Sequence, residues 1–292
     1  MLILLGYILR KRNIISQEFQ HDLGDFLITV VLPISILGSA NEVYDPSISM
    51  NLVYSGIIAS AYYVIAILVL TILSRHLPLS ENSRKIFLIT GIFANTGFIG
   101  MPLLQQLYGN EGMLYSVIYN LAYQLFFFSF GVKTVSGKKD NLVKSVLLDP
   151  GTIASIVAIV IFCSPFRFPA PVSNSLDLVG GMIVPLSMII IGCKLSQIRL
   201  KELILDWKPW LVSLFRLMVF PITMLLIMRI LGVGKTLADS MVVMTGLPAG
   251  ALNVILAEKY HCEEEFAAKA VSLSTFLMII SLPLLMAFLE MV

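Results

Sequence analysis

Two apolar stretches of the chain carry glycine, proline and amide residues where a continuous membrane helix would avoid them. Residues 86–107 read IFLITGIFANTGFIGMPLLQQL and include Asn95 and Pro102. Residues 236–258 read TLADSMVVMTGLPAGALNVILAE and include Pro248. Proline removes a backbone donor from a helix, and an amide in hydrocarbon is costly unless it pairs or faces water. Interrupted apolar segments at matching places in two halves of a chain are typical of the binding site of a secondary transporter.

Each interruption should divide its span into two half-helices. We expect the second half-helices to begin near Pro102 and near Pro248, because proline suits the first helical turn. Their first turns would present free backbone N–H groups and a partial positive charge. Such ends bind anions without a buried lysine or arginine. The two breaks therefore predict an anion site near the bilayer midplane.

Several polar side chains near the breaks could contact the ligand. Asn95 is the strongest candidate, whereas Asn253 could equally cap carbonyls freed across the second break. Thr96 and Thr245 could add hydroxyl contacts, although a threonine more often bonds its own helix. The substrate-site candidates at the breaks are Asn95, Thr96, Gly97, Pro102, Thr245, Pro248, Ala249 and Asn253.

Two further candidates lie in the next predicted span. Asn120 and Gln124 are four residues apart and share one helix face, so they either line the ligand pathway or join helices by hydrogen bonds. Arg216 lies inside a later span, where it either snorkels to the inner interface or lends charge to a bound anion. No acidic residue is expected at mid-membrane, so no proton relay and no charged sodium cage is visible. Unwound carbonyls could still hold sodium, which leaves proton or sodium coupling open; no cofactor is expected.

The composition is that of a polytopic membrane protein. Apolar residues make up 58% of the chain, charged residues only 13%, and the mean hydropathy is +0.90. Roughly 25% charged residues is usual in a soluble domain. The net charge of +2 does not indicate nucleic-acid binding, because the basic residues flank the apolar runs. The ten predicted spans are about 1–9, 23–40, 49–73, 86–107, 113–132, 151–165, 176–193, 209–231, 237–257 and 267–289.

The basic residues predict the orientation. Sixteen of the 20 lysines and arginines fall in or beside the loops that follow odd-numbered spans. Short loops rich in lysine and arginine stay in the cytoplasm. We therefore expect an inner (plasma) membrane protein with both termini on the periplasmic or extracellular side.

The first nine residues would reach only about 14 Å as a helix, too short to cross the bilayer. They form either a half-span or, the interpretation we favour, the end of a longer native helix. The three cysteines predict no disulfide framework. His261 and Cys262 precede three glutamates, but the spacing matches no known metal-ligand pattern and favours a solvated loop. No metal site is predicted.

The two halves resemble two copies of one unit. Pro33 should break span two and Pro185 span seven, each after an aspartate at the start of the helix. The separation from Pro33 to Pro102 is 69 residues, and that from Pro185 to Pro248 is 63. Five spans is an odd number, so the copies would enter the membrane from opposite sides, as in an inverted repeat. The alternative is coincidence, since prolines are common in membrane helices.

Four strings along nearly the whole chain resemble the auxin efflux carrier family of bacteria and plants. They are LLGYILRKRNII, the Leu-Pro pair of span two, NTGFIGMPLL and GLPAGALNVILAEKY. Carried over from the family, the asparagine that meets a substrate carboxylate falls on Asn95, and the crossover prolines fall on Pro102 and Pro248. Plant members often have a second proline where this chain has Asn253, and many carry a long hydrophilic loop that is absent here.

The resemblance implies ten helices, with a scaffold of spans 1, 2, 6 and 7 and a homodimer built through it. A transport domain of spans 3–5 and 8–10 would hold the crossed breaks and move as an elevator. In residues, this places the scaffold at 1–48 and 150–207, the transport domain at 49–132 and 208–292, and a cytoplasmic loop at 133–149. Malate and malonate permeases of bacteria are similar, so a small carboxylate is the expected cargo.

Four alternatives stay open. A sodium-coupled symporter of the bile-acid type has a similar fold. Sodium dependence of binding or uptake would distinguish it from a carrier of the auxin efflux type. A channel would conduct without saturation, and a receptor could share the fold. An intramembrane enzyme would need a nucleophile and base at depth. This alternative is the weakest, because His21, His76 and His261 all lie in loops or at span edges.

Overall fold

The computed structural model describes residues 1–41, 46–137, 150–197 and 206–291. Within these ranges the chain is helical, without a β-strand; the one extended pairing is an isolated bridge between Ala94 and Ala249. The predicted all-α class is confirmed. Most of the predicted loop at 133–149 lies outside the described residues, as do Lys138, Lys139, Lys144, Arg199 and Lys201.

The first half of the chain runs from a short helix to a long bent one. Its elements are α1 (Leu2–Lys11), α2 (Gln17–Phe26), η1 (Leu27–Val31), α3 (Leu32–Ser39), α4 (Pro46–His76), α5 (Glu81–Ile92), η2 (Thr96–Gly100), α6 (Met101–Phe126), η3 (Phe127–Gly131) and α7 (Val132–Ser136). Here η marks a π-helical turn. Within α6 the backbone turns sharply at Gly109, whose φ of +60° favours glycine.

The second half is also built of helices and ends in a long one, α17. Its elements are α9 (Pro150–Cys163), α10 (Ala170–Gly180), α11 (Ile183–Leu195), α13 (Trp207–Leu214), η4 (Phe215–Val219), α14 (Phe220–Leu231), α15 (Lys235–Thr245), α16 (Leu252–Lys259) and α17 (Glu264–Met291).

Among the described residues, six helical stretches are long and apolar enough to cross a membrane. They are Gln17–Ser39, Ile48–His76, Thr96–Ser136, Ala170–Leu195, Trp207–Leu231 and Glu264–Met291. Large apolar side chains are exposed on them, for example Ile57 on α4 and Leu284 on α17. Such surfaces suit contact with lipid rather than water. A multi-pass membrane protein is confirmed, whereas ten spans and the inverted repeat stay predictions.

Two of the prolines that were expected to break helices, Pro33 and Pro102, follow π turns in helices that continue through them. Among the described elements, η1, η2 and η4 each end two residues before a proline: Pro33, Pro102 and Pro221. A π turn shifts the hydrogen-bond register by one residue, which accommodates the missing donor inside a membrane helix. Hence the prediction that Pro33 breaks its span is wrong. Near Pro185 the helix is interrupted at Gly181 and Met182, just before α11 begins.

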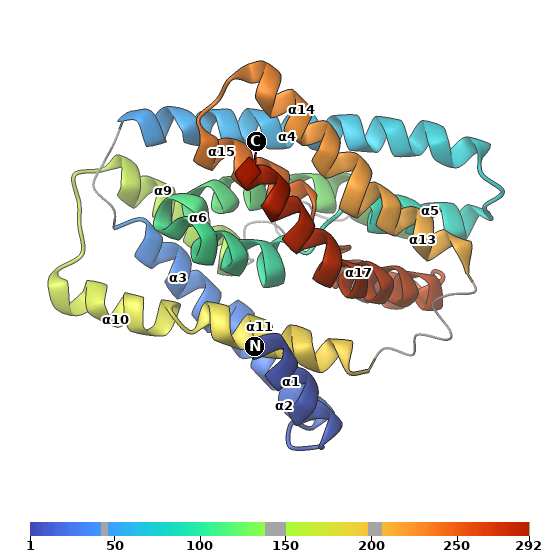
Figure 1. Ribbon diagram of the computed structural model, residues 1–292, viewed down its shortest axis with the longest axis horizontal. Helices are drawn as coiled ribbons and strands as arrows, with labels where there is room; N and C mark the ends of the chain where they lie inside the picture. The colour runs from blue at the N-terminus through green and yellow to red at the C-terminus, as the bar shows by residue number, and fades with distance from the viewer. Residues whose placement is uncertain (42–45, 138–149, 198–205, 292) are drawn as a thin grey trace.

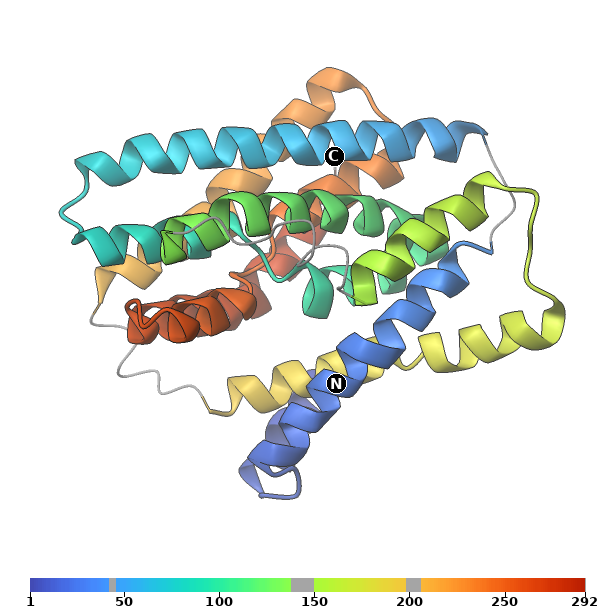
Figure 2. The same cartoon turned by 180° about the vertical axis from the view of Figure 1, so that it is seen from behind.

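The helices lie in a flattened bundle, with α4 along one side and α10 and α11 along the opposite side (Figures 1 and 2). On the α11 side, α1 packs on α11, and α3 packs on α9 and α10. On the α4 side, α4 packs on α6, α13 on α17, and α14 on α15. The interrupted helices lie between the two sides.

Glycines allow α1 and α11 to approach at backbone distance. A Cβ on Gly6 would overlap the carbonyl of Ile189, and a Cβ on Gly192 would overlap the carbonyl of Ile3. Small residues of this kind hold membrane helices together by close packing. The Cys193 thiol donates to the Gly6 carbonyl at 3.3 Å, and all three cysteines are free. The close glycine packing and the thiol hydrogen bond hold α1 against α11, although α1 is short.

Candidate substrate site at the helix crossover

Both predicted interruptions exist, but their positions differ from the sequence expectation. The helix α5 ends at Ile92, and helical structure resumes at Thr96; α15 ends at Thr245, and α16 begins at Leu252. The second half-helix of the first pair therefore begins at Thr96, and the expected start near Pro102 is wrong. Pro102 is buried in the first turn of α6, directly after the π turn η2.

The two extended segments cross and pair with each other. The Asn95 N–H donates to the Pro248 carbonyl at 2.9 Å, and the Gly250 N–H donates to the Phe93 carbonyl at 3.0 Å. These two bonds form the antiparallel bridge around Ala94 and Ala249. Because hydrocarbon offers no hydrogen-bond partner, each broken helix supplies the other with one donor and one acceptor.

Side chains from two elements complete the crossover. The Ala249 N–H donates to the hydroxyl of Ser274 on α17 at 3.1 Å. The Nδ2 of Asn253 donates to the Phe93 carbonyl at 2.9 Å, and Asn253 is fully buried. Asn253 thus caps a freed carbonyl, the structural alternative that the sequence left open. Thr245 is also buried, and its hydroxyl donates to Val242 in its own helix.

Arg216 lies behind the crossover and is fully buried. Its Nε donates to the Leu247 carbonyl at 3.0 Å and its Nη2 to the Thr245 carbonyl at 3.1 Å. Its Nη1 donates to the Ile92 carbonyl at 3.0 Å and to the Tyr62 hydroxyl at 2.7 Å. The interpretation that Arg216 snorkels to the interface is wrong, because its guanidinium bonds the freed carbonyls of both broken helices.

A cavity of about 120 Å³ lies in front of the crossover. It is enclosed by the crossed segments, by α6, and by η1, α3 and α9 from the opposite side of the molecule. Its lining residues are Ile28, Leu32, Ala94, Asn95, Thr96, Gly97, Phe98, Asn120, Tyr123, Gln124, Gly151, Gly250, Ala251 and Leu252.

The first turns of both second half-helices line this cavity. Thr96, Gly97 and Phe98 open η2, while Ala251 and Leu252 open α16. For the backbone N–H groups of these five residues, the structure records no acceptor among the described residues. Orphan donors at a helix start carry partial positive charge and bind anions. Two such starts therefore converge on one small cavity.

The side chains at the cavity add polar contacts. Asn95 is half-buried, and no hydrogen bond from its side chain is recorded within the described ranges. The Thr96 hydroxyl donates to the side-chain oxygen Oδ1 of Asn120 at 2.7 Å, which links the two candidate segments. A Cβ on Gly97 would meet no atom within 4 Å, so Gly97 faces open space. Gln124 lines the same wall as Asn120.

The structure thus divides the sequence candidates into two sets. Asn95, Thr96, Gly97, Asn120 and Gln124 come together at the cavity. The others, which build or flank the crossover and do not line the cavity, are Pro102, Thr245, Pro248, Ala249 and Asn253.

Other contributors to the site were missed by sequence reasoning. They include Tyr62 and Ser274 at the crossover, and Phe98 at the cavity. The Nζ of Lys194 on α11 lies 4.8 Å from the ring centroid of Phe98. No ion pair of Lys194 is recorded among the described residues, and only the fold places this lysine against Phe98 at the cavity.

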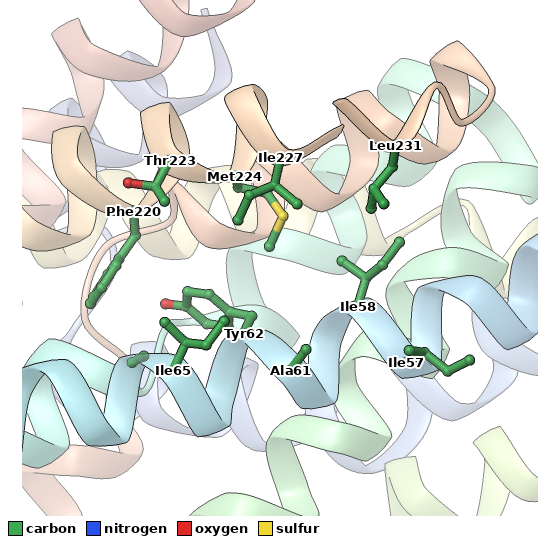
Figure 3. A pocket seen from close by; sticks show the side chains of 11 residues that line it. Ile57, Ile58, Ala61, Tyr62, Ile65, Phe220, Thr223, Met224, Ile227 and Leu231 are labelled. Atoms are coloured by element: carbon green, nitrogen blue, oxygen red, sulfur yellow. The ribbon is translucent and has the colours of Figure 1, made fainter. Parts of the chain in front are cut away.

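A second pocket, between α4 and α14, has a different character (Figure 3). It measures about 200 Å³, and its labelled walls are almost entirely aliphatic and aromatic, with Ile58, Tyr62 and Met224 on facing helices. It offers no set of polar donors to an anion. Nor is any group of three or more His, Cys, Asp or Glu residues placed to hold a metal ion in the part of the chain that the structure describes.

The sequence model of a family described as membrane transport protein matches residues 1–145 and 137–286. The chain belongs to this family. The transporter is similar to an uncharacterized transporter of Methanothermobacter thermautotrophicus, with 24% identity over 287 residues, 97% of this chain and 93% of the relative. It is also similar to the uncharacterized transporter MJ1031 of Methanocaldococcus jannaschii, with 21% identity over 282 residues, 94% of this chain and 91% of the relative.

Proposed function

We propose that this transporter is a secondary carrier of small organic anions that works by an elevator movement. The observation that carries the proposal is that one cavity is lined by Thr96, Gly97, Phe98, Ala251 and Leu252, whose backbone N–H groups have no recorded acceptor among the described residues. Oriented amides in a site of low dielectric stabilise an anion strongly without a salt bridge. The Asn95 amide would donate to one carboxylate oxygen of the cargo.

The size and charge of the surroundings favour a small acid. The cavity measures about 120 Å³, well below the roughly 300–1,000 Å³ of pockets for drug-sized ligands. Among the described residues that line it there is no aspartate or glutamate, and Lys194 and Arg216 carry positive charge nearby. We therefore propose a mono- or dicarboxylate, such as malate, malonate or an auxin-like acid.

The position of the cavity supports an elevator. One wall comes from the crossed helices and α6, and the opposite wall includes Leu32 of α3 and Gly151 of α9. We propose α1–α3 with α9–α11 as the scaffold, and α4–α7 with α13–α17 as the moving part. In this scheme the ten spans form two inverted repeats of five, and two copies dimerise through the scaffold. The carrier would lie in the inner membrane with both termini outside.

Transport of labelled malonate and malate into proteoliposomes tests this function. A carrier binds its cargo at each turnover, so uptake should saturate and should be accelerated by the same acid loaded inside the vesicles. Linear uptake without such exchange would indicate a channel. No uptake of any acid in a panel that includes an auxin-like acid would contradict the proposed cargo class.

A further inference from the structure

A buried guanidinium, with no carboxylate partner among the described residues, lies behind the crossover. Arg216 is fully buried, and its recorded bonds go to three backbone carbonyls and the Tyr62 hydroxyl; no ion pair with a described acidic residue is recorded. Burying a charge is expensive unless it is paired or densely hydrogen-bonded. An arginine is charged at any cellular pH, so this site holds one permanent positive charge.

The acceptors of Arg216 are the groups that hold cations in broken-helix transporters. Ile92 ends α5 and Thr245 ends α15, so their carbonyls lie at the negative ends of the first half-helices. Leu247 lies within the second extended segment. Unwound carbonyls and the C-terminal ends of half-helices are the usual ligands of a coupling sodium ion. Here the guanidinium takes three of them.

Tyr62 closes this position on the side of α4. Its hydroxyl accepts from Nη1 at 2.7 Å, and its ring forms part of the wall of the apolar pocket between α4 and α14 (Figure 3). Tyr62 therefore contacts the guanidinium through its hydroxyl and also lines that pocket. Because Arg216 has a planar fork of donors, it can bond all four acceptors at once, which a lysine could not do with the same geometry.

We propose that Arg216 is a built-in counter-cation, which fills the place of a coupling cation and makes anion binding in the adjacent cavity independent of sodium. The part concerning the anion rests on the proposed function. The positive ends of the second half-helices then face the cargo, while the negative ends of the first half-helices face Arg216. The crossover is thereby neutralised from within the chain.

The first test needs no cargo. Thermal unfolding of the purified wild-type protein should give the same midpoint in sodium and in potassium chloride of equal concentration. The Arg216→Ala variant should unfold at a lower temperature, and millimolar guanidinium, but not choline, should restore part of the loss. The Arg216→Lys variant should lie between the two, since it keeps the charge but not the fork. Specific stabilisation of the wild type by sodium would overturn the proposal, as would an Arg216→Ala variant as stable as the wild type.

The second test uses malonate as the probe. The dissociation constant of malonate for the wild type should agree in the two salts within about twofold, whereas a sodium-coupled site should change it about tenfold or more. If malonate bound ten times more tightly in sodium than in potassium, the proposed role of Arg216 would be wrong, whereas the proposed anion site would still be supported. Absence of malonate binding in either salt would count against the proposed function instead, while the unfolding experiment would still decide the role of Arg216.

Discussion

Replacing Gly250 with alanine should collapse the helix crossover and lower the free energy of unfolding by about 3–5 kcal/mol. A Cβ at this position would lie 2.7 Å from the carbonyl oxygen of Ala94 and 3.1 Å from its carbonyl carbon. Both are backbone atoms, so neither can rotate away. Relief would require the two extended segments to separate. That movement would break the bonds from Gly250 to Phe93 and from Asn95 to Pro248. Buried groups left unsatisfied in this way cost about 1–3 kcal/mol each.

Gly97→Ala is the matched control, because the same methyl group there meets no atom within 4 Å. Its stability should stay within about 0.5 kcal/mol of the wild type. Thermal unfolding of both variants in the same detergent measures the difference. Equal stability of Gly250→Ala and the wild type would show that the crossover does not hold the two broken helices together.

Replacing Asn95 with alanine should weaken anion binding by roughly 10- to 150-fold while the protein stays folded. The side chain lines the cavity and has no recorded bond to another described residue, so its loss leaves no described group unsatisfied. A hydrogen bond to a charged group contributes about 1.5–3 kcal/mol, which corresponds to this range of affinity. Titration calorimetry with malonate on wild type and variant provides the measurement.

Asn253→Ala is the matched control, because it removes the same type of side chain from another position at the crossover. Because its Nδ2 bonds the Phe93 carbonyl and the residue lies outside the cavity lining, this variant should lose stability, by about 1–3 kcal/mol, yet keep its affinity when folded. The two asparagines should therefore affect different properties. Wild-type affinity in Asn95→Ala would remove that residue from the site.

The interruptions themselves were predictable from sequence, but their exact start was not. Glycine, proline and asparagine inside an apolar run are strong local signals. The error at Pro102 arose because the π turn η2 tolerates the proline, so the chain unwinds seven to nine residues earlier, at Phe93, Ala94 and Asn95. A proline marks a perturbed helix, yet the crossing partner decides where the backbone opens.

For Arg216, the position in the span was predictable from sequence, but the role of the side chain was not. Its depth in the span followed from helical rise, but its role depended on carbonyls that lie 124 and 31 residues away in the chain, at Ile92 and Leu247. Helical periodicity gives no information about which segment faces a given side chain. The same reason explains why the wall formed by Ile28, Leu32 and Gly151 was absent from the sequence prediction. Polar residues on the broken helices could be found, whereas apolar residues on other helices could not.

The most direct measurement of the central claim is thermal stability of the purified transporter against a panel of mono- and dicarboxylates, with pH and salt varied. A ligand present at about 100 times its dissociation constant stabilises the folded protein by about 2.7 kcal/mol. We predict a rise in the unfolding temperature with at least one small acid, and its loss in Asn95→Ala. No rise with any acid would contradict an anion site at the crossover.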